Sequence, residues 1–389
     1  MQGLGVEGVI RQAVSFAQAN PEAALAALAA LVSVAVAAYL IRRYRRPAGA
    51  RFLSLLADQN EVAVLMHPNP DPDAMAAAIG VASLAEQVGT AVTLQFSGAV
   101  RHQENRAFRT VLDLEMQEVD HVSDVTAGSV VLVDHNEPRG FPGAEAVLPF
   151  AVVDHHPGDG TGEAFTDVRT AYGSTASIVT EYFMDIDAKP VPPDQHASEV
   201  PSEFTVPSRV ATGLLYGILA DTNRLTKGAS GDDFDAAGFL YAGVDEEFLD
   251  RIANPQVGAD VLEAKARAIA GRQVNGSFAV SDVGTLSNVD AIPQAADELM
   301  RLEGITAVVV CGECNGTIHL SGRSRDDRVH MGRALQTVVE EWPEASAGGH
   351  ARMGGGQVPV ARADGDDGRD EPDRGELVDR IFRTLAGES

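Results

Sequence analysis

Lysine, cysteine and tryptophan are nearly absent from this chain of 389 residues, which contains three Lys, two Cys and one Trp. Two cysteines exclude a disulfide-built scaffold. The 30 basic residues are therefore almost all Arg, and 56 acidic residues leave a net charge of −26. So acidic a chain has no broad basic surface, which argues against a protein that coats long nucleic acids. A small phosphate group can still be met by a few arginines or by a metal ion.

Acidic, lysine-poor composition is typical of proteins from salt-loving archaea. A net charge of −26 strains a compact state in dilute buffer through self-repulsion. At about 1 M salt the Debye length falls to about 3 Å and screens that repulsion. We therefore expect a haloarchaeal protein that requires salt for stability.

Residues 23–41 form a run of 19 residues without a charged side chain. As a helix the run would extend about 28 Å, close to the hydrocarbon thickness of about 30 Å. Four arginines follow within residues 42–46, and such a cluster holds its flank in the cytoplasm. We expect a single-pass membrane anchor within an N-terminal segment 1–47, with the rest of the chain cytoplasmic. An alanine-rich helix that does not enter a membrane is the alternative.

Strands and helices alternate after this segment, which predicts an α/β domain with a doubly wound, mainly parallel sheet. Parallel sheets bind ligands beyond the carboxyl ends of their strands. Three of the expected strands run directly into a segment that contains His or Asp. The expected strands span residues 61–66, 91–96, 129–133 and 150–153, and the expected helices span residues 74–88 and 210–220.

Four carboxylates and two imidazoles gather in these segments. Mixed oxygen and nitrogen ligands suit Mn²⁺ or Mg²⁺, with Co²⁺ a further option. Six ligands are too many for one ion that keeps open positions, but they suit two ions about 3.5–4 Å apart. One Asp must then bridge, and Asp134 at a central strand end is the expected bridge. The six expected ligands are His67, Asp71, Asp73, Asp134, His155 and Asp221.

The spacing of these motifs over about residues 58–260 resembles the DHH phosphoesterase family. The resemblance implies two Mn²⁺ or similar ions held by those six residues. It also implies that His156 lies beside the substrate phosphate and that Asp154 orients a histidine. The chain departs from the family pattern at Pro72, where Gly is usual, and at Ala77 and Ala78, where Ser is frequent.

A second α/β unit is expected after a helical linker. Asn315-Gly316 between apolar runs predicts a β-hairpin. A glycine-rich segment, 348–356, allows a backbone to approach an anionic ligand closely. His350, within this segment, can donate a hydrogen bond to a phosphate. Arg323 or Arg325, earlier in the sequence, can bind a phosphate bidentately.

This region resembles the C-terminal domain with a GGH loop that accompanies many DHH phosphoesterases. The implied substrate-binding residues are Arg323, Ser324, Arg325, Gly348, Gly349 and His350. The expected boundaries are 48–260 for the catalytic domain, 261–274 for the linker and 275–389 for the smaller C-terminal domain. The insertion 190–207 and the acidic segment 364–373 are expected on the surface, with no assigned role.

The expected function is hydrolysis of a small nucleotide by metal-activated water. Short oligoribonucleotides, 3′-phosphoadenosine 5′-phosphate and cyclic di-AMP are the candidate substrates. A membrane-tethered nucleotide sensor without turnover and a single-strand exonuclease resembling RecJ are the alternatives. The sequence leaves the oligomeric state open, with a homodimer as one option.

Overall fold

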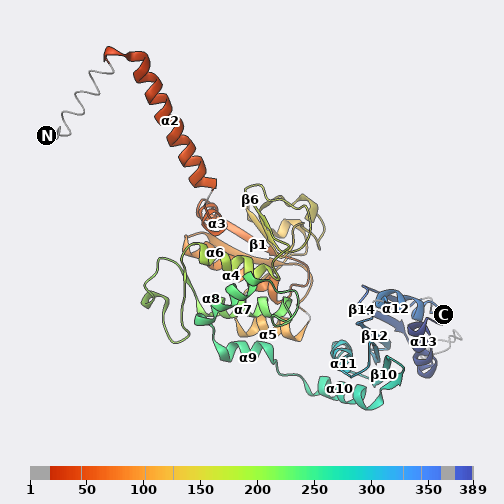
Figure 1. Cartoon of the computed structure of the whole chain (residues 1–389). Helices are drawn as coiled ribbons and strands as arrows, with labels where there is room; N and C mark the ends of the chain where they lie inside the picture. Colours follow the sequence, from red (N-terminus) through yellow and green to blue (C-terminus); the bar gives the residue numbers. More distant parts are fainter. Residues whose placement is uncertain are drawn as a thin grey trace. The chain divides into compact units, whose positions relative to one another are not determined.

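The computed structural model describes residues 18–44, 46–100, 102–125, 127–326, 328–342, 344–360 and 373–387. These residues form two compact units (Figure 1). The first contains the described residues up to Val100 together with Glu104–Ala253, and the second contains Asn254 and the described residues that follow it, with His102 and Gln103.

A parallel sheet forms the centre of the first unit. Its six strands lie in the order β3-β2-β1-β4-β5-β6, and every neighbouring pair is parallel. The chain builds outward from β1 in one direction and then from β4 in the other. The point where the order reverses therefore lies between β1 and β4, where α/β sheets bind their ligands. The strands are β1 Glu61–Met66, β2 Ala91–Phe96, β3 Gln117–Glu118, β4 Val130–Val133, β5 Pro149–Asp154 and β6 Phe165–Val168.

Helices of the first unit cover this sheet and supply the core. Helix α4 is almost wholly buried, and small side chains allow α7 to approach it closely. A Cβ built on Gly217 would lie 2.7 Å from the Cβ of Ala76, so only glycine fits there. The helices are α3 Ala48–Ala57, α4 Pro72–Gln87, α5 Gln103–Val111, α6 Thr175–Asp185, α7 Ser208–Asp221, α8 Gly231–Leu240 and α9 Glu246–Ala253.

The departures from the family pattern have a local explanation. Pro72 is the first residue of α4, a position that proline's fixed φ and missing N–H suit. Ala77 and Ala78 are fully buried in the hydrophobic core. They support the helix that carries Asp73.

The expected anchor coincides with helix α2, Pro21–Tyr44. The side chains at 28, 31 and 35–44 lie outside the described residues. No helix in the part of the chain that is described combines the length and the apolar character needed to cross a membrane.

The insertion expected on the surface carries little regular structure. Strands β7, Lys189–Pro190, and β8, Thr205–Val206, pair at its two ends in a separate parallel two-stranded sheet. Between them lies a single 3₁₀ turn, Ala197–Glu199, whose residues are exposed.

A mixed sheet forms the second unit, in the order β13-β14-β12-β11-β10-β9. Only β10 and β11 are parallel, and the other neighbouring pairs are antiparallel. The strands are β9 Gln273–Asn275, β10 Phe278–Thr285, β11 Ala307–Cys314, β12 Thr317–Ser324, β13 Ser346–Gly349 and β14 Met353–Pro359. The helices are α10 Ala259–Gly271, α11 Ala291–Leu299, α12 Met331–Val339 and α13 Arg374–Ala386.

One of two predictions about this sheet is confirmed, and the other differs from the structure. The hairpin at Asn315-Gly316 is confirmed: both residues have positive φ, 52° and 75°, and Cys314 pairs with Thr317 across the turn. The glycine-rich segment is a hairpin of β13 and β14 rather than a free loop, with Gly349 paired to Gly354. Most of the acidic segment 364–373 lies outside the described residues.

Candidate metal centre

The segment after β1 carries three of the expected ligands because it ends in the first turn of a helix. Asp71 is the N-cap of α4, and its side chain accepts a hydrogen bond from the backbone N–H of Ala74 at 3.1 Å. Asp73 lies one residue inside the helix and is fully buried. Helix geometry thus holds both carboxylates at the positive end of the α4 dipole.

The N-terminus of a second helix, α6, contacts Asp73 and Asp134. The backbone N–H groups of Thr175 and Ala176 donate to the two oxygens of Asp73 at 2.7 and 2.9 Å. The Thr175 hydroxyl donates to Asp134 Oδ1 at 2.9 Å. Two helix N-termini, those of α4 and α6, therefore stabilise negative charge at Asp73.

Asp134 lies at the centre of the cluster, directly after β4 and with a φ of 62°. His67 Nε2 lies 3.4 Å from Asp134 Oδ2 and 3.5 Å from Asp71 Oδ1. The ligand atoms of these three residues all lie within 4.8 Å of one another. They form the first group that can hold a divalent ion.

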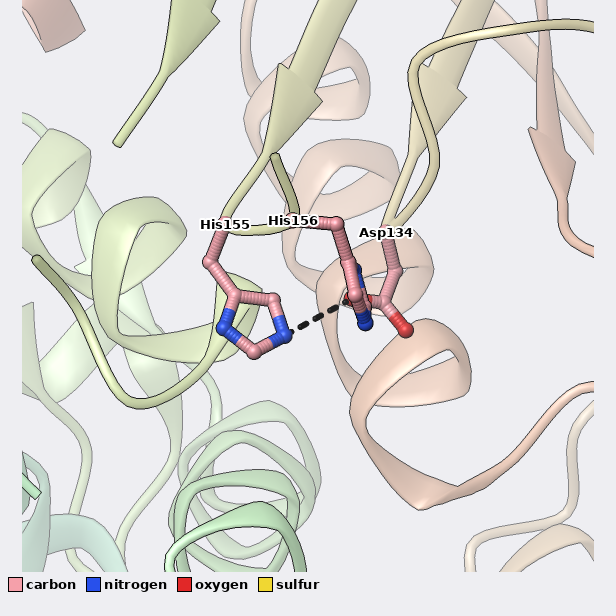
Figure 2. A group of neighbouring side chains, drawn as sticks. All are labelled: Asp134, His155 and His156. Carbon is pink, nitrogen blue, oxygen red and sulfur yellow. Dashed lines mark ion pairs between the residues drawn. The ribbon is translucent and has the colours of Figure 1, made fainter. Parts of the chain in front are cut away.

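A second group lies on the other side of Asp134. His155 Nε2 lies 3.5 Å from Asp134 Oδ1, 3.9 Å from Asp73 Oδ2 and 3.2 Å from Asp221 Oδ2. Asp73, His155 and Asp221 again meet the geometric condition for a metal site. Figure 2 shows Asp134 facing His155, with the ion pair dashed, and His156 beside them. Asp134 thus contacts a histidine of each group with a different oxygen, as a bridging carboxylate would.

The crowded carboxylates and their burial shift the pKa values of Asp73, His67 and His155. Burial and the neighbouring charges of Asp134 and Asp221 raise the pKa of Asp73 well above its usual range. Burial opposes charging of His67, but Asp134 and Asp71 outweigh it and raise the pKa of His67 to about 10. In the same way Asp221 and Asp134 overcome burial and raise the pKa of His155 to about 9. Added positive charge would therefore stabilise the ionised carboxylates of the cluster.

Divalent metal ions would supply this positive charge, and the two histidines are arranged to bind them. The Nε2 atom of His155 is buried without a hydrogen-bond partner of good geometry. Its Nδ1 faces the carbonyl of Tyr172 at 3.3 Å, and Nδ1 of His67 faces the carbonyl of Pro68 at 3.0 Å. Those carbonyls favour a proton on Nδ1 and leave both Nε2 lone pairs directed at the carboxylates, as metal-ligating histidines require.

His156 and Asp154 form a pair at the rim of the cluster. Asp154 is fully buried at the end of β5, and its Oδ1 lies 3.0 Å from His156 Nδ1. The Asn136 amide donates to the other oxygen at 2.7 Å. The hydrogen bond that His156 donates to Asp154 raises the pKa of His156. Half of the His156 side chain is exposed, and its expected place beside the substrate phosphate stays a prediction.

The chain is strained directly after Asp221. Asn223, Arg224 and Leu225 all have positive φ, from 46° to 60°, and none is glycine. Left-handed backbone costs on the order of 1–2 kcal/mol per residue. Buried Thr222 holds the turn: its hydroxyl accepts the Leu225 N–H at 3.0 Å and donates to the Ile218 carbonyl.

The residues predicted to bind substrate in the second unit lie at the end of β12 and on the neighbouring β13–β14 hairpin. Ser324 N–H donates to the carbonyl of Arg352 at 2.8 Å, which places the hairpin tip with His350 next to the end of β12. His350 and Arg325 are exposed. The Arg323 guanidinium, however, is already paired with Asp297 of α11 at 2.6 Å. Ser324 is buried, and its hydroxyl donates to the Asp326 carbonyl.

Sequence reasoning missed the residues that position the ligands. Thr175 and Asn136 contact Asp134 and Asp154, yet no predicted site included them. Ser174, which caps α6 by accepting the Ser177 N–H, precedes an apolar run. That N-cap pattern was readable. Nothing local marks Asn136. The structure brings all six expected ligands together, and their metal-binding roles remain predictions.

Comparison with known proteins identifies the two units by family. Residues 61–218 match the DHH family, N-terminal domain, and residues 275–382 match the DHHA1 domain. Together the two matches take up more than half of the chain. The chain belongs to the DHH family of phosphoesterases.

Three relatives illustrate the range of that family. An uncharacterized protein of Methanocaldococcus jannaschii is 32% identical over 298 residues, which are 76% of this chain and 58% of the relative. The cyclic-di-AMP phosphodiesterase GdpP of Geobacillus thermodenitrificans is 25% identical over 325 residues, 78% of this chain and 45% of GdpP. A probable manganese-dependent inorganic pyrophosphatase of Enterococcus faecalis is 25% identical over 185 residues, 46% of this chain and 54% of that protein. The chain thus spans about half the length of these relatives.

Proposed function

We propose that this chain hydrolyses a phosphodiester or phosphomonoester bond of a small nucleotide, using two divalent ions, with Mn²⁺ preferred. The observation that carries the proposal is the shared carboxylate: Asp134 faces His67 with one oxygen and His155 with the other, at the switch point of a parallel sheet. Two metal-binding groups on one bridge are the arrangement that phosphoryl-transfer sites use.

The roles of the chain's own residues follow from the contacts. When bound, the ions would supply a water of lowered pKa and positive charge for the phosphoryl oxygens. Thr175 and the N-terminus of α6 hold Asp134 and Asp73 in place. His156, whose pKa is raised by its contact with Asp154, is placed to bind a phosphoryl oxygen and stabilise developing charge.

A nucleotide substrate is favoured over pyrophosphate because the similarity to a nucleotide phosphodiesterase covers more of the chain than the similarity to a pyrophosphatase. The match to GdpP covers 78% of the chain, whereas the match to the pyrophosphatase covers 46%. The second unit also has a cavity of about 510 Å³ lined by His319, Ser321 and residues of the glycine-rich hairpin. Its size is in the range of small-molecule sites. The cyclic dinucleotide and short oligoribonucleotides are equal first candidates.

A side-by-side assay tests the proposal. The protein, in high salt with Mn²⁺, is given cyclic di-AMP, linear diadenylate, a short RNA, 3′-phosphoadenosine 5′-phosphate and pyrophosphate. We expect turnover of at least one nucleotide. Binding of a nucleotide without turnover would instead favour the sensor. Activity on pyrophosphate alone, or mainly on long single strands, would also contradict the proposal.

We also propose that the enzyme works at the cytoplasmic face of a membrane. Support comes from the uncharged run 23–41 and the arginines after it, and from exposed apolar side chains of α2 such as Leu25 and Val34. Membranes from expressing cells, washed with alkaline carbonate, should retain the protein. Release into the supernatant would contradict the anchor.

A further inference from the structure

A cavity of about 380 Å³ lies in the first unit, against α5, α7 and α9. Ala220 lines it, and the next residue is the expected ligand Asp221. Glu104 lines it as well, and the neighbouring Asn105 donates to the carbonyl of Pro70 at 3.0 Å, within the segment that carries His67 and Asp71. Consecutive Cα atoms are about 3.8 Å apart. The cavity therefore adjoins the metal centre through both α5 and α7.

The walls of this cavity combine an apolar surface with carboxylate acceptors. Leu219, Leu249 and Ala253 supply apolar contacts, and the carboxylates belong to Glu104, Glu246 and Asp250. Glu104 also accepts a hydrogen bond from the Tyr216 hydroxyl. Carboxylates at the wall repel a phosphate, but they accept hydrogen bonds from amino groups and ring N–H groups.

A nucleobase has the matching chemistry, because its faces are apolar and its edge carries N–H donors. A dry cavity of about 150 Å³ holds benzene, so the present cavity has room for a fused two-ring base. A carboxylate accepting from an exocyclic amino group is an established mode of base recognition.

One cation lines the same cavity. The Arg224 side chain is exposed, and it makes no hydrogen bond or ion pair with a residue that the structure describes. It lies three residues after Asp221, inside the strained left-handed turn that Thr222 holds. Strain of this kind persists where the surrounding structure enforces it and is concentrated at functional sites. A free guanidinium beside a metal centre is suited to bind a phosphate oxygen.

We propose that this cavity binds a purine base of the nucleotide substrate and that Arg224 contacts a phosphate of the same nucleotide. The inference rests on the proposed function, because it places the base next to the phosphoryl group at the metal centre. The first unit would then be the part of the chain that selects a base.

Filling the cavity tests the base. Ala253→Phe is compared with the matched control Ala197→Phe, in the exposed insertion. The substrates are linear diadenylate and an abasic analogue with the same backbone. We expect kcat/KM on diadenylate to fall about 5- to 150-fold in Ala253→Phe, as for the loss of one stacked base, with little change on the abasic analogue. Unchanged cleavage of diadenylate, or equal losses on both substrates, would overturn the proposal.

Arg224→Gly tests the cation and separates binding from structure. Glycine relieves the left-handed strain, so a purely structural role predicts an unchanged KM. We expect KM for diadenylate to rise about 10- to 150-fold, as for the loss of a charged hydrogen bond, with kcat retained. An unchanged KM would remove Arg224 from the substrate site.

A binding measurement keeps this inference distinct from the proposed function. AMP is titrated into the native protein and into Ala253→Phe with Mn²⁺ present. Absence of turnover on every phosphoester would refute the proposed function, whereas the cavity would still be supported by AMP binding that Ala253→Phe weakens. Equal AMP affinity of the two proteins, or no AMP binding by the native protein, would overturn the cavity.

Discussion

In the first unit all the strands of the six-stranded sheet are parallel, so their carboxyl ends share one edge, and residues from three strand ends meet around Asp134. In the second unit most neighbouring strands are antiparallel. There the tip of the β13–β14 hairpin, which carries His350, is held beside the end of β12 by the hydrogen bond from the Ser324 N–H to the Arg352 carbonyl. A parallel sheet brings side chains from several strand ends to one place, whereas the mixed sheet presents the glycine-rich hairpin of β13 and β14.

The first unit should depend on a single carboxylate. Asp134→Ala removes the bridge between the two groups, and we expect turnover to fall by at least about 10³-fold. The fold should survive, because Asp134 lies after a strand end rather than in the apolar core. Steady-state kinetics and a thermal melt measure both effects, with exposed Asp194→Ala as the matched control. Near-native rates at saturating Mn²⁺ would remove Asp134 from the site.

Support from α6 should matter less than the bridge itself. Thr175→Val removes the hydroxyl that donates to Asp134 but keeps the backbone N–H groups on Asp73. We expect a loss of about 10- to 150-fold in kcat, the range for a hydrogen bond to a charged group. Buried Thr180 of the same helix, which bonds only the Ala176 carbonyl, provides the control Thr180→Val. Equal losses in the two variants would mean that helix packing, not the contact with Asp134, is responsible.

The sequence predicted the site in the first unit better than the site in the second. Six His and Asp residues at strand ends and helix ends predicted the cluster, because parallel topology leaves them one place to meet. The state of Arg323 was not readable, because its partner Asp297 belongs to a helix 26 residues away in sequence. The glycine-rich segment looked like a loop because glycine has a low strand propensity, and tertiary pairing with β12 overrides it.

The second unit should affect binding more than chemistry. His350→Ala removes an exposed donor at the hairpin tip, and we expect KM to rise about 10- to 150-fold with kcat and Mn²⁺ content unchanged. Kinetics together with metal analysis distinguishes the two units. If Mn²⁺ content fell while KM stayed the same, His350 would belong to the metal site.

The smallest effect should come from releasing Arg323. Asp297→Ala breaks an ion pair in which Asp297 is 60% exposed, so we expect little loss of stability. The freed guanidinium should strengthen nucleotide binding by up to about fivefold, equivalent to about 1 kcal/mol. Titration of a nucleotide into this variant measures the change. Weaker binding would mean that Arg323 acts only when Asp297 holds it.

The number of Mn²⁺ ions bound per chain tests the central claim most directly. Equilibrium dialysis of the native protein in high salt, followed by metal analysis, should give two Mn²⁺ per chain. The matched variant Asp134→Asn keeps the shape of the bridge and removes its charge, and it should bind at most one ion tightly. A native protein that binds one ion or none would contradict a two-metal centre built on Asp134.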